Sequence, residues 1–152
     1  MRKKVMKVER DQAQAARWFT HEVRVRYEET DQMGVVYHAN YLTWFEIGRT
    51  EMIRSLGMPY QTLEARGLLL PLTEAEMKFR LPARYDDWVT IRVRVSEFSN
   101  LRLTFDCEIL RGEDLLVTGR TKHVWLNRDW RPTRIDKEAP DLYALIKASS
   151  DC

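Results

Sequence analysis

Two residues with chemically active side chains, Asp31 and His38, lie in and just after a short polar loop that leads into a helical pattern. Gly34 follows the acid, and a residue without a side chain lets a ligand approach the backbone closely. Backbone N–H groups at the start of the next helix lack partners within the helix and favour negative charge. A carboxylate opposite such donors can act as a general base or as a nucleophile, while the donors hold an oxyanion.

Each of these two side chains also has an ordinary structural explanation. Acids are common in turns, where they hydrogen-bond to the backbone, so Asp31 could cap the helix or stay solvated. A lone histidine such as His38 is more often a structural donor than a catalyst. Its place in the first helical turn favours a role for its backbone N–H, although the imidazole could also orient water.

The loop precedes one strongly apolar helical stretch, which the spacing places between Asn40 and Gly57. Asn40 is expected to be the N-cap, and Gly57 is expected to end the helix. The apolar residues form an arc too wide for a helix that lies on a surface, so this helix is expected to be wrapped by other elements. Only the edge that carries Glu46 and Arg49 is expected to stay polar, and these two are spaced for an i,i+3 ion pair.

Alternation of polar and apolar residues predicts strands around this helix. The predicted strands are 22–28, an extended stretch from 68 to 81, 89–96, 101–109 and 115–126. Turn signals at Ser99-Asn100 and at Gly112 join consecutive strands as hairpins. One strand, one long helix and an antiparallel meander of four strands define an α+β fold. The simplest packing curls a single sheet around the helix.

The loop and the helix start share a run of fixed spacing, Thr-Asp-x-x-Gly-Val-Val-Tyr-His at residues 30–38. This run resembles the hotdog-fold thioesterases, in particular the 4-hydroxybenzoyl-CoA thioesterase and YbgC-like acyl-CoA thioesterase family. Further matching residues are Tyr27, Asn40, Tyr41, Glu46, Arg49 and Glu51, with a weaker match at 82–87. The resemblance covers residues 20–127 and implies the hotdog fold, an antiparallel sheet wrapped around one long central helix.

The resemblance implies an acyl-CoA thioesterase that hydrolyses a thioester to a carboxylic acid and a free thiol. It assigns catalysis to Asp31 and His38, with Asp31 as a general base or as a nucleophile that forms an anhydride, and both routes stay open. A thiolate leaves without much acid help, because the pKa of its conjugate acid is about 8.5 if CoA behaves like cysteine. No cofactor is implied, and no metal site is expected, since the histidines lack metal-ligand spacing.

The acyl group is expected beside the start of the helix, between Asp31 and Glu46. The residues expected to bind substrate are Gly34, Val35, Tyr37, Tyr41, Glu46, Lys78, Phe79 and Arg84. Bulky residues near the helix, also including Trp44, Phe45 and Met77, leave little room for a long tunnel. We therefore expect short aliphatic or small aromatic acyl groups. The candidates for the phosphates of CoA are Lys78, Arg80, Arg84 and Lys122.

Two other functions remain open on the sequence. A hotdog dehydratase or hydratase would act on a β-hydroxyacyl chain with a histidine that faces an acid from another segment, and the spacing of Asp31 and His38 argues against it. A non-catalytic acyl-carrier or protein-binding module could keep the fold without the activity. The sequence also leaves open whether CoA or an acyl carrier protein delivers the acyl group.

Length, charge and cysteine content point to one domain in a reducing cytoplasm. The 152 residues include 25 basic and 23 acidic side chains, a near balance that predicts neither nucleic-acid binding nor membrane-surface binding. No apolar run approaches the about 20 residues of a membrane span, so no membrane insertion is expected. Cys107 and Cys152 are expected to be free thiols.

Residues 1–19 are expected to be a loosely ordered or helical extension, and residues 20–152 the hotdog domain with a C-terminal helix that starts near Pro140. Trp18 and Phe19 could attach the extension to the domain. The resemblance implies a homodimer, often assembled into a homotetramer, with some phosphate-binding basic residues coming from the neighbouring chain.

Overall fold

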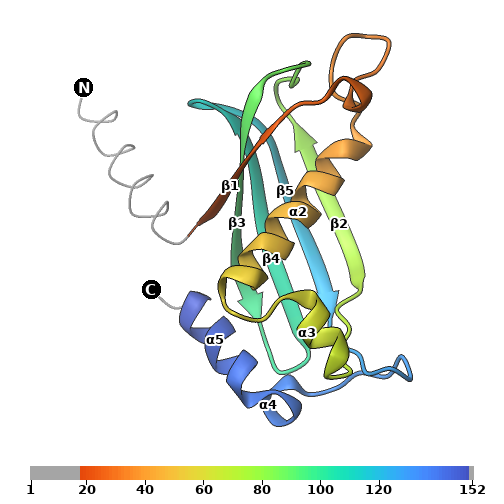
Figure 1. Ribbon diagram of the computed structural model, residues 1–152, viewed down its shortest axis with the longest axis vertical. Helices are drawn as coiled ribbons and strands as arrows, with labels where there is room; N and C mark the ends of the chain where they lie inside the picture. Colours follow the sequence, from red (N-terminus) through yellow and green to blue (C-terminus); the bar gives the residue numbers. More distant parts are fainter. Residues whose placement is uncertain (1–17, 151–152) are drawn as a thin grey trace, which may run out of the picture.

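The computed structural model describes residues 18–150, which form one antiparallel sheet curled around a long helix (Figure 1). The elements are β1 (Phe19–Arg24), the 3₁₀ turn η1 (Tyr27–Glu29), α2 (Ala39–Ser55), α3 (Tyr60–Ala65), β2 (Leu72–Phe79), β3 (Trp88–Phe98), β4 (Arg102–Arg111), β5 (Asp114–Val124), α4 (Ile135–Glu138) and α5 (Pro140–Ser150). The predicted α+β architecture is confirmed. Most of the predicted extension over residues 1–19 lies outside the described residues.

The strand order is β1-β3-β4-β5-β2, so only β3, β4 and β5 form a meander. The predicted meander of four strands is wrong for β2, which pairs with β5 at the far edge. The segment between β2 and β3 therefore crosses the end of the sheet instead of forming a hairpin. Two of its backbone carbonyls are bound by other parts of the chain: the N–H of Val36 in the loop before α2 donates to Ala83 at 2.8 Å, and the guanidinium of Arg111 on β4 donates to Pro82 at 3.1 Å.

The helix α2 lies across the inner face of the sheet and carries the centre of the core. Trp44 and Phe45 are fully buried there. Gly48 lets the helix approach β3, because a Cβ at this position would lie 2.5 Å from Cγ2 of Val93 and 2.7 Å from Cγ2 of Ile91. A larger residue would force the helix and the sheet apart.

The start of α2 differs from the prediction. The N-cap is His38 and not Asn40. The Asn40 side chain donates its amide to the carbonyl of Glu29 at 2.8 Å, so it is used to hold the preceding loop rather than to cap the helix. The predicted end of the helix is confirmed, since Gly57 has a φ of 86° and its N–H donates to the carbonyl of Arg54 at 2.9 Å.

The polar edge expected along α2 is wrong at Arg49, which is 8% exposed. It follows Phe45 by one helical turn and therefore lies on the buried face. The expected ion pair with Glu46 does not form, and within residues 18–150 the Nε and Nη1 atoms of Arg49 have no hydrogen-bond partner. Arg49 instead lies beside the hydroxyl of Tyr60, while Glu46 stays exposed.

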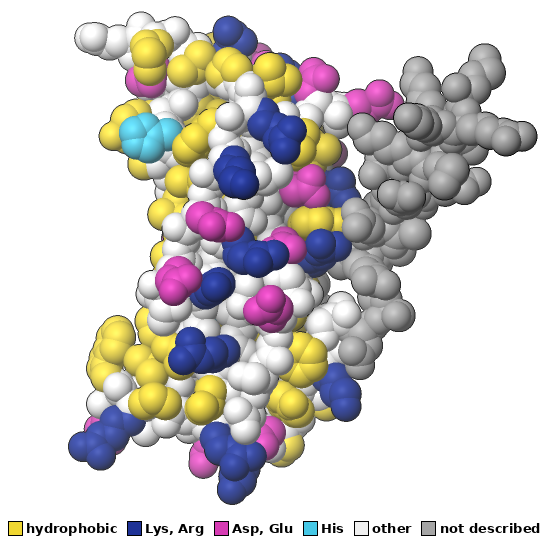
Figure 2. Space-filling view, turned by 180° about the vertical axis from the view of Figure 1, so that it is seen from behind, with side chains coloured by type: hydrophobic (Ala, Val, Ile, Leu, Met, Phe, Trp, Pro, Cys, Tyr) yellow, Lys and Arg dark blue, Asp and Glu magenta, His cyan; other side chains and the backbone are white. Residues whose placement is uncertain are grey.

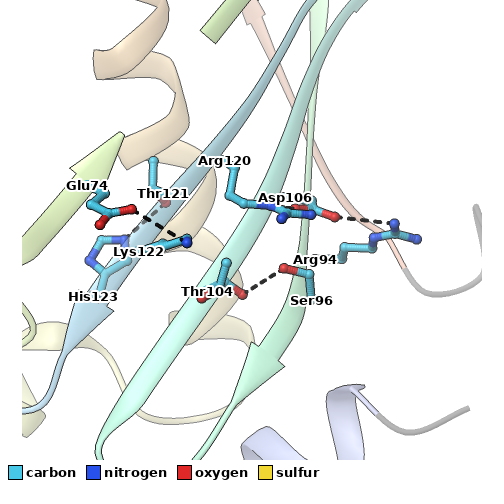
Figure 3. A network of polar contacts seen from close by, with 9 residues as sticks. All are labelled: Glu74, Arg94, Ser96, Thr104, Asp106, Arg120, Thr121, Lys122 and His123. Carbon is cyan, nitrogen blue, oxygen red and sulfur yellow. Dashed lines mark hydrogen bonds and ion pairs between the residues drawn. The ribbon is translucent and has the colours of Figure 1, made fainter. Parts of the chain in front are cut away.

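The outer face of the sheet is covered by acidic and basic side chains that alternate in sign (Figure 2). Asp106 lies between two cations from neighbouring strands, with Arg120 Nε at 2.9 Å and Arg94 Nη2 at 3.3 Å. Lys122 pairs with Glu74 across the β5–β2 junction at 3.5 Å (Figure 3). This face is therefore a solvated surface stabilised by cross-strand charge pairs.

The sheet begins earlier than the sequence predicts. β1 starts at Phe19, and the chain leaves the sheet after Arg24 to form η1, whereas the predicted strand covered 22–28. The indole ring of Trp18 lies under the guanidinium groups of Arg92 and Arg94, at 4.7 and 4.5 Å from its centroid. Trp18 and Phe19 thus attach the start of the described chain to β3 by cation–π contacts and by strand pairing.

Candidate active site

The loop that carries Asp31 is a closed turn between η1 and α2. Its neck is an antiparallel bridge between Thr30 and Val36. The N–H of Asp31 donates to the carbonyl of Val35 at 2.9 Å, and the N–H of Gly34 donates to the carbonyl of Asp31 at 3.0 Å. Gly34 has a φ of 80°, in the left-handed region that glycine adopts without strain. The loop therefore holds the Asp31 carboxylate in a defined backbone frame.

Asp31 lines a pocket of about 270 Å³. The lining residues are Asp31, Met33, Val35, Val36, His38, Tyr41, Phe79, Arg80, Leu81 and Pro82. They come from three segments: the Asp31 loop, the start of α2, and the end of β2 with the residues that follow it. Apolar walls with a few polar groups are typical of a site for a small molecule.

Tyr41 joins the helix to the far wall of this pocket. Its hydroxyl accepts the N–H of Ala83 at 3.1 Å, and its ring lies 5.8 Å from that of Phe79, centroid to centroid. Burial raises the pKa of the Tyr41 hydroxyl, which therefore stays protonated at neutral pH. Because the oxygen accepts from the backbone, the hydroxyl proton is available to a ligand in the pocket that Asp31 also lines.

An ion pair fixes the segment that forms the far wall. Arg111 on β4 reaches the carboxylate of Asp87 at 2.8 Å and also binds the carbonyl of Pro82. The N–H of Arg84 donates to the same carboxylate at 2.9 Å. Burial alone would raise the pKa of Asp87, but the hydrogen bonds from Arg84 and Arg111 outweigh it and hold this pKa below its usual value. The wall therefore rests on a charged, hydrogen-bonded support.

His38 brings a backbone donor and an imidazole to the pocket. Within residues 18–150 its backbone N–H has no acceptor, whereas the N–H groups of Asn40 and Tyr41 donate to the carbonyls of Tyr37 and His38 at 2.9 and 3.3 Å. The imidazole lies 4.4 Å from the Tyr37 ring and 6.4 Å from the Phe79 ring, centroid to centroid. A donor at this place can stabilise an oxyanion beside the Asp31 carboxylate.

The structure brings only part of the predicted substrate-binding set to the pocket. Val35, Tyr41 and Phe79 line it. Gly34 and Tyr37 belong to the same loop but do not line the pocket, and Tyr37 is 47% exposed. Four further residues do not line it. Glu46 is exposed farther along α2, and Arg84 is exposed in the segment after β2. Trp44 and Phe45 are buried in the core.

The basic residues expected at the CoA phosphates separate onto two faces. Arg80 lines the pocket with Asp31. Lys78 and Lys122 project from the outer face of the sheet, because the strand pleat turns them away from α2. Lys122 pairs with Glu74 there, and Lys78 lines a separate hollow of about 380 Å³.

Sequence reasoning missed four residues that line the pocket, Met33, Val36, Leu81 and Pro82, and one supporting acid, Glu29. Met33 is 80% exposed within the polar loop, and Leu81 is 45% exposed at the end of the apolar alternation that includes Phe79, where the pattern indicates a strand and not a pocket wall. Glu29 is buried, although it lies in a run of polar residues and its neighbour Glu28 is exposed. Burial of one acid in a polar run has no signature in the sequence, because the side chain that covers it, Trp44, is distant along the chain.

No group of three or more His, Cys, Asp or Glu side chains among residues 18–150 could hold a metal ion. His123 is buried and contacts the carbonyl of Leu70 and the hydroxyl of Thr121 through its two ring nitrogens. Cys107 is a buried free thiol, and burial raises its pKa to about 12. Over the same range, no helix is long and apolar enough to cross a membrane.

Comparison with known proteins agrees with this geometry. The family model of the thioesterase-like superfamily matches residues 25–144. The acyl-CoA thioesterase YbgC of Haemophilus influenzae is 36% identical over 131 residues, which cover 85% of this chain and 96% of that protein.

Solved structures give the same result. The structure of a DHNA-CoA thioesterase from Staphylococcus aureus has a TM-score of 0.81 and 34% identity, and covers 86% of this chain and 91% of its own. That of a 1,4-dihydroxy-2-naphthoyl-CoA thioesterase from Synechocystis has a TM-score of 0.76 and 26% identity, and covers 86% of this chain and 96% of its own. The shared architecture confirms the predicted hotdog fold.

Proposed function

This chain belongs to the thioesterase-like superfamily and is a thioester hydrolase, and we propose that it cleaves short aliphatic or small aromatic acyl-CoA thioesters with Asp31 as the catalytic carboxylate. The observation that carries the proposal is the pocket shared by the Asp31 carboxylate and by His38, whose backbone N–H is unpaired within residues 18–150. One positioned acid and one oxyanion donor meet the needs of thioester cleavage.

The reaction begins with the thioester carbonyl beside the start of α2. Asp31 takes a proton from water as the oxygen of that water adds to the carbonyl carbon, or its carboxylate adds directly and forms an anhydride that water then hydrolyses. In both routes the backbone N–H of His38 holds the oxyanion of the tetrahedral intermediate. Collapse of this intermediate breaks the C–S bond and releases CoA as a thiolate that needs little acid assistance. This step yields the carboxylic acid directly in the first route, and in the second route it yields the anhydride, which water hydrolyses afterwards.

The size and lining of the pocket support a preference for compact acyl groups. A volume of about 270 Å³ is lined by Tyr41 and Phe79, and bulky aromatic rings at a pocket of this size leave little room for a long acyl chain. Two relatives with this fold are named for aromatic acyl-CoA substrates, which supports including aromatic acyl groups in the proposal.

Arg80 is the proposed contact for a phosphate of CoA. It is exposed and lines the same pocket as Asp31, so a carrier whose thioester lies at Asp31 can extend past the guanidinium. Lys78 and Lys122, on the outer face of the sheet, would serve this role only for CoA bound to a neighbouring chain.

The proposed assembly is a homodimer, or a homotetramer of two such dimers, as the resemblance implies. Support comes from β2, an edge strand whose side chains are almost all exposed and which has no strand on its outer side among residues 18–150. Such an edge is a ready site for pairing with a second chain. Light scattering should give a dimer or tetramer at micromolar concentration, and a stable, active monomer would contradict this assembly.

Release of free thiol, measured with a dithio reagent across a panel of acyl-CoAs, tests the function. We expect turnover of butyryl-CoA or benzoyl-CoA. A hydratase would add water to an enoyl-CoA without releasing thiol, and a binding module would release none from any substrate. Acyl carrier protein loaded with the same acyl groups, in parallel assays, identifies the carrier by its larger kcat/KM.

A further inference from the structure

The buried carboxylate of Glu29 lies where the Asp31 loop meets α2. Glu29 is 6% exposed, whereas its neighbour Glu28 belongs to the solvent-exposed side of η1. One oxygen of the Glu29 carboxylate accepts the indole N–H of Trp44 at 2.7 Å, and the other accepts the backbone N–H of Arg26 at 2.8 Å. This carboxylate therefore joins the segment before the loop to the second turn of the helix.

The backbone of Glu29 joins the same parts of the chain a second time. Its carbonyl accepts the N–H of Tyr37 at 2.9 Å and the side-chain amide of Asn40 at 2.8 Å. The two residues of the loop neck lie directly beside this contact, since Thr30 follows Glu29 and Val36 precedes Tyr37. Glu29 thus fixes both ends of the loop relative to the first turns of α2.

From these contacts we propose that Glu29 is a positioning residue, which sets the place of the Asp31 carboxylate relative to the oxyanion donor at the start of α2. The inference rests on the proposed role of Asp31. Within residues 18–150 the hydrogen bonds of Asp31 all stay inside its own loop, so the orientation of the whole loop decides where its carboxylate lies. A small misplacement of a catalytic group is enough to lower the rate strongly.

Only a carboxylate satisfies both donors at this position. Trp44 and Arg26 each present an N–H, and a carboxylate accepts from both because its two oxygens are both acceptors. A glutamine has one acceptor oxygen and one donor NH₂, so in either orientation an N–H would face an N–H. The loop or the indole must then move, because a buried donor without an acceptor is destabilising.

The test compares Glu29→Gln with Glu28→Gln, a matched change in the same turn at an exposed glutamate that pairs with Arg26. With benzoyl-CoA or butyryl-CoA, Glu29→Gln should lower kcat by about 10- to 100-fold and change KM little. Glu28→Gln should leave both constants unchanged. A merely structural role would lower the melting temperature but leave kcat of the folded enzyme at the wild-type value, and that result would overturn the proposal.

The double variant Asp31→Asn/Glu29→Gln separates this proposal from the proposed function. If Glu29 acts through Asp31, the double variant should be no slower than Asp31→Asn alone, because there is no carboxylate left to misplace. Effects that multiply would overturn the positioning role while leaving Asp31 catalytic. Normal turnover by Asp31→Asn would instead refute the proposed function, because that function assigns catalysis to Asp31.

A second substitution keeps the test decisive if Glu29→Gln does not fold. Trp44→Phe removes the indole donor and keeps most of the buried ring, so the loop loses one of its two attachments through the carboxylate. Its kcat should fall by less than the fall expected for Glu29→Gln, again with little change in KM. A folded Trp44→Phe enzyme with the kcat of the wild type would contradict the proposal.

Discussion

The backbone N–H of Met33 donates to Oδ1 of Asp31 at 2.9 Å, so the loop holds the carboxylate of its own acid by a local turn. Within residues 18–150 no other hydrogen bond or ion pair reaches this carboxylate, and its second oxygen is available to water or to substrate. The carboxylate is therefore fixed by its own loop while one of its oxygens stays free of protein contacts within residues 18–150.

Asp31→Asn should preserve this turn but abolish most of the thioesterase activity. The amide oxygen can still accept from Met33, so the loop and the melting temperature should change little. The amide can neither take a proton from water nor attack the carbonyl carbon, and kcat should fall by about 10²- to 10⁴-fold. Steady-state thiol release measures the loss, and a folded variant with near-normal turnover would refute the assignment.

His38→Ala should be less damaging than Asp31→Asn. The substitution removes the imidazole but keeps the backbone N–H that is proposed to hold the oxyanion. The residual kcat of His38→Ala should therefore exceed that of Asp31→Asn under the same conditions. Equal inactivity of the two folded variants would assign catalysis to the imidazole itself.

The acyl-chain preference should show as a trend in kcat/KM. Each additional methylene changes the binding free energy by only about 1–3 kcal/mol, so a series is more informative than one pair of substrates. Butyryl-CoA and benzoyl-CoA should be hydrolysed more efficiently than palmitoyl-CoA, because Tyr41 and Phe79 close the pocket. A rise in efficiency up to palmitoyl-CoA would mean that the pocket is deeper than these residues allow.

Gly48→Ala should destabilise the fold. Alanine favours a helix over glycine by about 1 kcal/mol, but overpacking of a core costs about 1–3 kcal/mol. The new methyl group would overlap Val93 and Ile91 on β3, whose backbone cannot move away without disturbing the sheet. Urea denaturation should therefore show a lower free energy of unfolding. Thr43→Ala, at an exposed position of the same helix, is the control and should be neutral or slightly stabilising.

His123 should make stability depend on pH in the mildly acidic range. Burial, reinforced by the charge of Arg49, lowers its pKa from 6.5 to about 4. Between these values the unfolded chain binds the proton and the folded chain does not. Stability is therefore complete above pH 6.5 and is lost as the pH falls toward 4, by up to about 3 kcal/mol.

The comparison of His123→Gln with the wild type isolates this effect. Melting temperatures measured from pH 4 to pH 7 should fall less steeply for the variant, whatever its stability at neutral pH. Identical slopes would show that His123 titrates alike in the folded and unfolded chains.

The parts of the fold that depend on local pattern could be predicted from the sequence. Alternation predicted β3, β4 and β5, and the apolar spacing predicted α2 together with its end at Gly57. The place of β2 could not be predicted in this way, because pairing with β5 rather than β3 depends on how the crossing segment is held by Arg111 and Val36.

Only the part of the candidate site that lies in one short sequence motif could be predicted from the sequence. Asp31 and His38 lie in a run of fixed spacing, and the structure places both at one pocket. Arg49 and Glu29 were not recognised as buried, because the burial of a charged side chain is decided by partners that are distant in sequence. The N-cap was misplaced because Asn40 has a partner in the preceding loop, which helix-capping preferences do not include.

The strand order also determines which partial unfolding events would disrupt the pocket. The two edge strands, β1 and β2, pair with strands that are distant in sequence, and Phe19 on β1, for example, pairs with Val93 on β3. In the centre of the sheet, by contrast, β4 and β5 are joined by a tight turn. The Asp31 loop follows one edge strand and the wall at Leu81 follows the other. Because strands at an edge open at a lower free energy than a central meander, partial opening at either side separates the pocket walls while the core stays intact. Heat inactivation of the enzyme is thus expected to precede the melting of its core.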